Sequence, residues 1–294
     1  MAKVSIIIPV CNAEAYILKC LKSLQDQSFS DIKIICIENG SSDNSWEEIL
    51  SQKKDKRLVA LRAPHQDVSY ARNVGLFWAL KFSPYVMFCD ADDTYERNMV
   101  ETMVEGIERT AADLACCEIC VKYKTDLSLK ESDNKYYTLK FDGIQNNIKA
   151  IINNIDYSLC NKIFRASIIR KYSLTFPGAM HYEDACFCWK YLSVANSVFF
   201  IKKKLYNYLR HENSIMNKTF SKSNDSINHL AITDNVYEFL KLHNLRDELM
   251  DEFVKFYDAS VYFAKQHSNG EYLQNIEDLD LKLSKKFFPW RYDE

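Results

Sequence analysis

The sequence predicts an α/β protein with a mostly parallel, mixed sheet flanked by helices and followed by a C-terminal helical extension. Strand-like and helix-like segments alternate four times in about the first 90 residues, a rhythm that implies right-handed βαβ crossovers. Several predicted strands end in polar turns, and ligands of such sheets bind beyond the carboxyl ends of the strands. Beyond residue 216 apolar residues recur at helical spacing without any strand pattern.

Composition narrows the class of protein. The chain of 294 residues can hold one large domain or a domain with an appendage, and its 47% hydrophobic content is typical of a globular protein. A net charge of -2 gives no reason to expect a nucleic-acid partner. No stretch reaches the roughly 18 to 20 uninterrupted apolar residues of a membrane span, and the N-terminus lacks a signal-peptide cleavage region. We therefore expect a cytoplasmic protein.

The ten cysteines are predicted to be reduced thiols, because the chain is long and carries no secretory signal. Residues 116–120 contain a C-x-x-C motif, but the second thiol pair, Cys186 and Cys188, has the wrong spacing for a zinc site. A buried strand is the favoured interpretation of residues 116–120. Four other cysteines fall within apolar strand or helix patterns: Cys11, Cys20, Cys36 and Cys89.

The elements of the first 90 residues are predicted from apolar periodicity and turn residues. Residues 4–10 form a β-branched apolar run that is typical of a central parallel strand. Asn12 is expected to cap the first helix, and Ser42 or Asp43 to start the second. The predicted order is strand 4–10, helix 13–27, strand 32–37, turn 38–45, a helix through residue 50, strand 58–61, a loop through Pro64 and Gln66, helix 69–80 and strand 85–89.

Three carboxylates follow the last of these strands, at Asp90, Asp92 and Asp93. Carboxylates are rarely buried unless they are paired or bind a metal, and three together repel one another. Hard divalent cations such as Mg²⁺ or Mn²⁺ are a common remedy. The alternative is an acidic turn in which Asp93 or Thr94 caps a helix that starts near Tyr95.

The polar turns around Asn12, Glu38 and Asp90 all follow predicted strands. Because the carboxyl ends of parallel strands meet at one edge of a sheet, these turns are expected to converge there. Three polar or acidic loops on one edge are hard to explain as solvated turns alone. This edge is therefore the predicted binding site.

A second acidic pair, Glu183 and Asp184, lies about 90 residues beyond the first and opens a predicted helix. The dipole of that helix is by itself a structural reason for acidic residues at this position. The remaining predicted elements of the main domain are helix 99–109, strand 114–121, surface loop 122–134, helix 144–155, a helix within 157–169, helix 183–191, and strands 197–201 and 205–209.

Residues 217–294 are predicted to form a helical extension that packs on the main domain or on a partner. Its last segment, 282–292, mixes basic and aromatic residues. Such a mixture suits a peripheral anchor at the inner face of a membrane, because Trp and Tyr favour the headgroup layer and basic residues its anionic lipids. An ordinary packed C-terminal segment is the alternative.

Six segments between residues 3 and 216 together resemble glycosyltransferase family 2, whose members are inverting enzymes with a GT-A fold. D-x-D alone occurs by chance in many proteins, but all six segments share the order and separations of the family. They are 4–14, 38–43, 68–73, 90–93, Glu183–Asp184 with Phe187, and 206–214. The resemblance implies a GT-A domain over 1–216, with a nucleotide-binding half at 1–95, an acceptor half at 96–216, and a separate extension at 217–294.

The resemblance also implies roles for individual residues. Asp92 is implied to bind Mn²⁺ or Mg²⁺ between the two phosphates, with His211 as a second metal candidate. The nucleotide, usually with uracil as its base, is implied to contact Pro9, Val10, Asn12, Glu14, Glu38, Arg72, Asp90 and Ala91. The donor sugar or the acceptor is implied to lie near Asp93, Glu183 and Lys162.

Asp184 is implied to be the general base that takes the proton of the acceptor hydroxyl. The nucleoside diphosphate that leaves develops negative charge, which a metal ion neutralises. Inversion needs the acceptor on the opposite face of the sugar, where one carboxylate suffices as base. The two acidic clusters are thus expected to have separate tasks, one holding metal and the other taking a proton.

Two departures from the family pattern concern the predicted base pocket. Cys11 stands where an aromatic residue is common, and Glu38 with Asn39 replaces the usual pair of aspartates. The preference for a particular donor base is therefore open.

The predicted function is transfer of a hexosyl or N-acetylhexosaminyl group from a UDP-sugar to a glycan or lipid-linked acceptor in cell-surface polysaccharide synthesis. One alternative is a nucleotidyltransferase, although no Gly-rich, basic phosphate loop follows the first strand. The other is a non-catalytic protein that binds nucleotide sugars.

Overall fold

The computed structural model describes residues 2–63, 67–124, 129–132, 137–178, 180–211 and 224–292. Several predictions concern residues outside these ranges. They are the loop through Pro64 and Gln66, part of the loop 122–134, residues 212–214 of the sixth family segment, and the start of the helical extension at 217–223.

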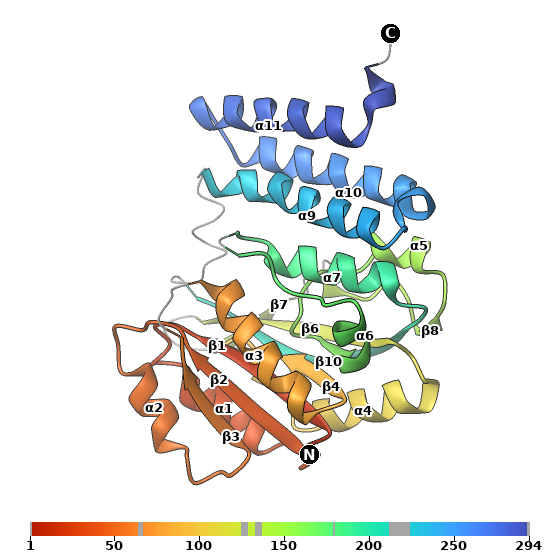
Figure 1. Ribbon diagram of the computed structural model, residues 1–294. Helices are drawn as coiled ribbons and strands as arrows, with labels where there is room; N and C mark the ends of the chain where they lie inside the picture. The colour runs from red at the N-terminus through yellow and green to blue at the C-terminus, as the bar shows by residue number, and fades with distance from the viewer. Residues whose placement is uncertain are drawn as a thin grey trace.

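The N-terminal half alternates between strands and helices as predicted, and Figure 1 shows its helices around the sheet. β-Branched and other apolar residues fill the central strands, which are buried on both faces. Its elements are β1 (Val4–Val10), α1 (Ile17–Gln25), β2 (Ile32–Glu38), α2 (Ser45–Ser51), β3 (Leu58–Arg62), α3 (Val68–Phe82), β4 (Tyr85–Phe88), β5 (Thr94–Tyr95) and α4 (Met99–Thr110).

The predicted cap of the first helix is wrong, and the alternative in which Asp93 or Thr94 caps a helix is excluded. Asn12 does not cap α1, because its φ of 50° places it in a left-handed turn and the helix begins five residues later at Ile17. Neither Asp93 nor Thr94 caps a helix, since Thr94 and Tyr95 pair with Asn207 and Tyr206 as the short strand β5, and α4 begins at Met99. Pairing with distant residues therefore decides the conformation of Thr94 and Tyr95.

The second half of the main domain contains more strand than predicted. Residues 162–165 form a strand before the helix at 166–171, and the predicted loop 122–134 includes the end of the strand 114–124 and all of the strand 129–132. The two strands predicted at 197–209 form one strand with register shifts. The elements are β6 (Leu114–Lys124), β7 (Leu129–Ser132), β8 (Gly143–Gln145), α5 (Ile148–Ile152), β9 (Lys162–Arg165), α6 (Ala166–Lys171), α7 (Glu183–Val194) and β10 (Val198–Arg210).

Within the described residues, the main path of the mixed ten-stranded sheet has the order β3-β2-β1-β4-β9-β6-β10-β5. β3, β2, β1 and β4 are parallel to one another, as the crossovers predict. β9 lies antiparallel between β4 and β6, and β6 is parallel to β10. The predicted α/β class is confirmed, and the antiparallel strand β9 separates two parallel groups.

Helix α3 packs closely on β1 at Gly75. A Cβ atom at this position would overlap the side chain of Ile7, so only glycine allows the helix to approach the strand this closely. This contact fixes the end of α3 that carries Arg72, one turn earlier. Arg72 therefore belongs to a rigid helix.

Within the described residues, three α-helices follow the sheet domain: α9 (Asn228–Leu242), α10 (Arg246–Gln266) and α11 (Glu271–Phe287). Figure 1 shows them stacked in succession beyond α7. Aromatic rings join the layers, because Trp189 of α7 lies 5.5 Å from the ring of Phe256, and Tyr237 of α9 lies 4.4 Å from that of Phe287. No helix in the described ranges has both the length and the apolar character to cross a membrane.

All ten cysteines lie in the described ranges and are free thiols. Nine are buried, including the three at 116–120, which lie in strand β6, so the prediction of a buried strand there is confirmed. Cys11 is the exception, because it is exposed at the turn after β1.

Candidate functional site

The site lies at the edge of the sheet where β1, β2 and β4 end. β1 and β2 run in parallel register as far as the pair Val10 and Glu38, and β4 ends two residues before Asp90. α7 and β10 bring distant segments to the same edge. Side chains that are 111 to 119 residues apart in sequence contact one another there.

Hydrogen bonds join the turns after β1 and β2. The side-chain oxygen of Asn12 accepts from the N–H of Ser42 at 2.8 Å, and the hydroxyl of Ser41 accepts from the N–H of Asn12 at 3.1 Å. One carboxylate oxygen of Glu14 accepts from the backbone and side-chain N–H groups of Asn44 at 2.9 and 3.0 Å. Asn12 and Glu14 therefore shape the two turns, and direct contact of either with a nucleotide stays a prediction.

Glu38 is a buried carboxylate at the end of β2, with an exposed fraction of 5%. One of its oxygens accepts from the N–H of Ser41, and the other lies 3.4 Å from Nε of Arg62. The guanidinium of Arg62 lies 4.5 Å from the ring centre of Trp46. The side-chain oxygen of Asn39 is also buried and has no hydrogen-bond partner among the described residues. Buried acceptors thus gather where the sequence predicts a nucleobase.

Asp90 and Asp92 are partly exposed, and each lies beside a basic side chain from another element. Asp90 lies 3.1 Å from Nη2 of Arg72, and Asp92 lies 2.9 Å from Nε2 of His211. Burial and repulsion by Asp90 raise the pKa of Asp92, which His211 offsets only in part. The ionised carboxylate of Asp92 is therefore only partly stabilised by the protein's own groups.

Asp93 has a different environment, with an exposed fraction of 1%. One oxygen accepts from the hydroxyl of Tyr206, and the other from the N–H of Leu209 at 2.7 Å. The Tyr206 oxygen also accepts from the N–H of Asp90 at 3.3 Å. The predicted contact of Asp93 with sugar or acceptor is contradicted, because both carboxylate oxygens are engaged inside the protein. Asp93 instead ties the acidic turn to β10.

Asp92 and His211 present the donor atoms that suit a divalent metal such as Mn²⁺. The ring of Tyr16 stacks on His211, with centroids 4.6 Å apart, and so fixes the plane of the imidazole. Over the described ranges, no group of three or more His, Cys, Asp or Glu side chains is arranged to hold a metal. The pair fits an ion that shares its coordination with the phosphates of a substrate, as Mg²⁺ commonly does.

Arg72 connects the two acidic clusters. Its Nη1 donates to Glu183 and its Nη2 to Asp90, and its exposed fraction is 7%. Burial opposes the charge of Arg72, but Glu183 and Asp90 more than offset this effect, so its pKa lies above the ordinary value. Arg72 is thus a permanent cation that holds the start of α7 beside the turn after β4.

Asp184 lies in the first turn of α7 and is partly exposed. Its carboxylate accepts from the N–H of Ala185 at 2.7 Å. Burial and repulsion by Glu183 raise its pKa to about 7, although Arg72 and the Ala185 N–H act in the opposite direction. A carboxylate with this pKa has the proton affinity that general base catalysis near neutral pH requires.

Lys162 is a second correction. It is fully buried in β9, and its Nζ donates to Asp156 at 3.1 Å, to the Ser158 carbonyl at 2.6 Å and to the Asn161 side chain at 2.8 Å. A side chain so enclosed does not reach a diphosphate or an acceptor at the surface. Lys162 instead fixes the chain between Asp156 and β9.

The other predicted nucleotide contacts differ in exposure. Val10 is fully buried, and its carbonyl accepts from the N–H of Asn39 at 2.8 Å, so its side chain does not face a ligand. Pro9 is partly exposed and Ala91 is 8% exposed. Their contact with a nucleotide stays a prediction.

The contacts of two site residues, Tyr206 and Tyr16, have no recognisable signal in the sequence. Tyr206 belongs to the sixth family segment, but its bonds to Asp93 and Asp90 depend on how β10 crosses the sheet. Tyr16 stacks on His211 across the fold, and nothing in the local pattern around either residue reveals that pairing.

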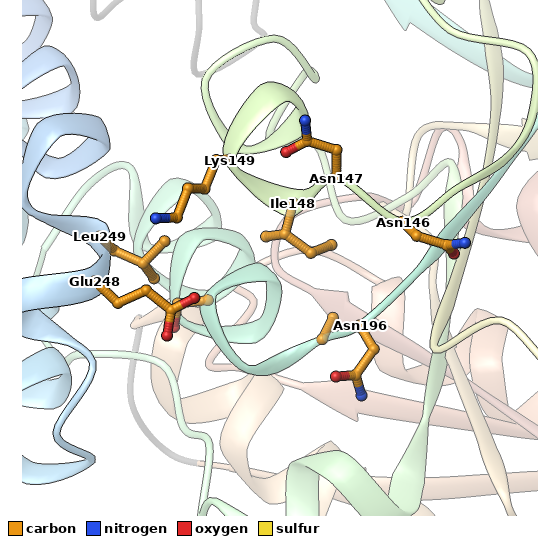
Figure 2. A pocket seen from close by; sticks show the side chains of 9 residues that line it. Asn146, Asn147, Ile148, Lys149, Asn196, Glu248 and Leu249 are labelled. Carbon is orange, nitrogen blue, oxygen red and sulfur yellow. The ribbon is translucent and has the colours of Figure 1, made fainter.

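A separate pocket of about 300 Å³ lies between α5, the end of α7 and the start of α10. Figure 2 shows the amides of Asn146, Asn147 and Asn196 around it, with Lys149 and Glu248 on the side of α10. It adjoins the end of α7 opposite to Asp184. None of the sequence-predicted site residues lines it, so we place the chemistry at the sheet edge.

Sequence comparisons relate this site to known proteins. Residues 5–173, more than half of the chain, match the profile described as Glycosyl transferase family 2. The "Putative glycosyltransferase EpsH" of Bacillus subtilis (strain 168) is 30% identical over 290 residues, covering 93% of this chain and 81% of that protein. The teichoic acid poly(glycerol phosphate) polymerase of Staphylococcus epidermidis is 26% identical over the whole chain, which spans only 37% of the polymerase.

Solved structures with a similar fold include S. aureus TarS 1-349 in complex with UDP-GlcNAc. Its TM-score is 0.63 at 19% identity, covering 99% of this chain and 92% of that chain. The mannosyltransferase PcManGT from Pyrobaculum calidifontis, in complex with GDP-Man and Mn²⁺, has a TM-score of 0.58 at 11% identity, with coverages of 99% and 82%. These similarities confirm the GT-A architecture with its C-terminal helices.

Proposed function

The chain belongs to glycosyl transferase family 2, and from this membership we propose that it moves a sugar from a UDP-sugar to a hydroxyl of a glycan or lipid-linked acceptor, with inversion. The observation that carries the proposal is the double contact of Arg72 with Asp90 and Glu183. This contact keeps the nucleotide side of the site and the proposed base, Asp184, at a fixed separation. Fixed reactant geometry is a main source of rate enhancement.

The proposal of UDP as the donor nucleotide rests on the buried acceptors at the end of β2. The side-chain oxygen of Asn39 has no hydrogen-bond partner among the described residues and suits the imide N–H of uracil, with the carboxylate of Glu38 beside it in the chain. The UDP-GlcNAc complex of TarS supports the same donor class and an N-acetylhexosaminyl group as one candidate for transfer.

We assign Asp92 and His211 to a divalent cation, Mn²⁺ or Mg²⁺. The Mn²⁺ in the PcManGT complex supports this assignment. The ion, when bound, supplies positive charge to the departing diphosphate. The protein's own part is to orient the ligands, since Tyr16 fixes the ring of His211 and Tyr206 fixes the turn that carries Asp92.

Asp184 is the proposed general base. With its pKa near 7, its carboxylate accepts the proton of the acceptor hydroxyl as the new glycosidic bond forms. Glu183, which the sequence associates with the donor sugar or acceptor, is engaged with Arg72 and in this proposal serves to position the base.

The proposal is tested by a screen of donor hydrolysis without acceptor, using UDP-GlcNAc, UDP-glucose, UDP-galactose and GDP-mannose with Mn²⁺ or EDTA. We expect release of UDP from one UDP-sugar that depends on Mn²⁺. Release from GDP-mannose alone would contradict the choice of UDP. UDP binding without hydrolysis of any donor, even with added glycan acceptors, would favour the non-catalytic alternative.

We also propose a cytoplasmic location with contact to a membrane surface through the last residues. Phe287 and Phe288 are fully buried, so the basic aromatic segment is in part an ordinary packed one. Trp290 and Tyr292 are 55% and 44% exposed, and Nζ of Lys285 lies 5.7 Å from the ring centre of Tyr292. The proposed membrane contact is therefore limited to Trp290, Tyr292 and Lys285.

Sedimentation with vesicles of phosphatidylglycerol and phosphatidylethanolamine tests this contact. We expect Trp290→Ser with Tyr292→Ser to weaken binding by about tenfold, because two interfacial rings are lost. Tyr262→Ser, which removes a ring that is 68% exposed on α10, is the matched control. Equal binding by all three proteins would contradict the anchor.

A further inference from the structure

Tyr182, two residues before the proposed base Asp184, has an unusual backbone conformation. Tyr182 has φ 65° and ψ 26°, in the left-handed region that an aromatic residue seldom adopts. It flanks the N-terminus of α7 and makes no side-chain capping hydrogen bond there. Such a conformation persists only where the surrounding structure imposes it.

Rings from two C-terminal helices pack on Tyr182. The ring of His229, in α9, lies 3.2 Å from that of Tyr182 between centroids, and Phe263 of α10 approaches it edge-on at 6.3 Å. His229 in turn lies 4.2 Å from Phe263, which stacks on His267 at 4.0 Å. These four rings form a continuous series of contacts, here called the ring ladder, from the segment before α7 to the end of α10.

His229 takes part in this ladder as a neutral, flat ring. Burial, together with the nearby His267, lowers the pKa of His229 to about 3. Its Nε2 is buried and has no hydrogen-bond partner among the residues that the structure describes. Phenylalanine is therefore a suitable replacement that keeps the packing and removes the unsatisfied nitrogen.

We propose that His229 and Phe263 hold Tyr182 in its left-handed conformation and thereby set the position of Asp184, so that the C-terminal helices complete the geometry of the catalytic site. Asp184 follows Tyr182 by two residues, and a change of φ at Tyr182 redirects the chain at the first turn of α7. His229 and Phe263 are positioning residues, because they act through Tyr182. The inference rests on the proposed function for the role of Asp184.

The first experiment compares His229→Ala, which removes the ring, with His229→Phe, which keeps it. The control is His243→Ala, because His243 also packs against two rings, at 4.4 Å and 5.2 Å, but at the other end of α9. Hydrogen exchange of residues 180–188 is measured in the free protein, and kcat and KM are measured for Mn²⁺-dependent hydrolysis of UDP-GlcNAc.

We expect His229→Ala to raise exchange at 180–188 by about fivefold, because the held segment opens locally. We expect it to lower kcat by about tenfold to 100-fold while KM stays within about twofold, because the base is displaced and the nucleotide site is not. The other two variants should match the wild type in both measurements. Unchanged exchange, or raised exchange with full kcat, would overturn the proposal.

A second variant separates positioning from loss of folding. Glycine adopts positive φ without steric cost, so adding Tyr182→Gly to His229→Ala should recover part of kcat. A fall in kcat, KM and melting temperature together, without this recovery, would mean a general structural role and would also overturn the proposal. If the wild type hydrolyses no nucleotide sugar, the proposed function fails, whereas the exchange measurements still decide whether the ladder holds the segment.

Discussion

Five acidic side chains of one site have separate tasks because their partners differ. Asp93 is enclosed by Tyr206 and a backbone N–H, and Asp90 and Glu183 share Arg72. Asp92 faces His211, while Asp184 has a pKa near 7 and remains partly exposed. Burial and neighbouring charge, rather than residue type, assign these tasks.

The pH dependence of the reaction follows from Asp184. Only the ionised carboxylate accepts a proton, and its pKa is raised to about 7. Activity should therefore be lost as pH falls through 7, with kcat/KM decreasing about tenfold per unit below that value and levelling above it. A profile measured between pH 5 and 9 with the hydrolysed donor checks this.

Asp184→Asn is the matched variant, because an amide of nearly the same shape does not accept the proton. We expect kcat to fall by about 100-fold or more while the UDP dissociation constant stays near that of the wild type. A variant with near wild-type kcat would refute the assignment of the base.

The role of Asp92 is tested by a different measurement, the increase in melting temperature that the donor nucleotide causes. UDP with Mn²⁺ should raise the melting temperature, while either alone does little, because ligands that bind only the folded state stabilise it. Asp92→Ala should abolish the joint effect, since the carboxylate proposed to hold the ion is gone. An equal shift by UDP in the presence of EDTA would argue against the metal role.

The elements that the sequence predicts well are those formed by local pattern. The strand at 4–10 and the alternation up to β4 agree with the structure because each apolar run there is long enough to be distinctive. β9 is only four residues long and β5 two, and both form because distant strands pair with them. The sequence therefore predicts the positions of Asp90 and Glu183, which follow or begin elements with a distinctive local pattern. It does not predict the partners of Asp93, because they depend on how distant strands pair.

β9 also carries a testable buried ion pair. Lys162→Met leaves the carboxylate of Asp156 buried and uncompensated, so the free energy of unfolding should fall by about 3 to 5 kcal/mol. Urea unfolding measures this loss, and Lys203→Met, an exposed lysine in β10, is the control. A variant with unchanged stability but weaker UDP binding would restore the prediction that Lys162 contacts the ligand.

The C-terminal helices are packed against the sheet domain through aromatic rings. Trp189 is fully buried, and its contacts include Phe253 and Phe256 of α10. Removal of α9–α11 exposes this ring and others on α7. The division of the chain at residue 216 into a domain and a separate extension therefore stays a prediction.

A chain ending at residue 223 tests whether the first part folds alone. We expect it to lack a cooperative thermal transition and to aggregate on size-exclusion chromatography, because a large apolar face of α7 meets water. A cooperative transition close to that of the full chain would show that the extension is dispensable for folding.

β10 and the residue after it are synthesised later than the acidic turn that they contact. It supplies Tyr206 to Asp93, and His211 follows it to meet Asp92, 119 residues after that aspartate in the chain. During synthesis the acidic turn therefore emerges long before its partners do. The stretch that matches the family profile, 5–173, ends before α7 and β10, so a nascent chain of that length is recognisable as a family member while Asp92 and Asp93 still lack their contacts with His211 and Tyr206.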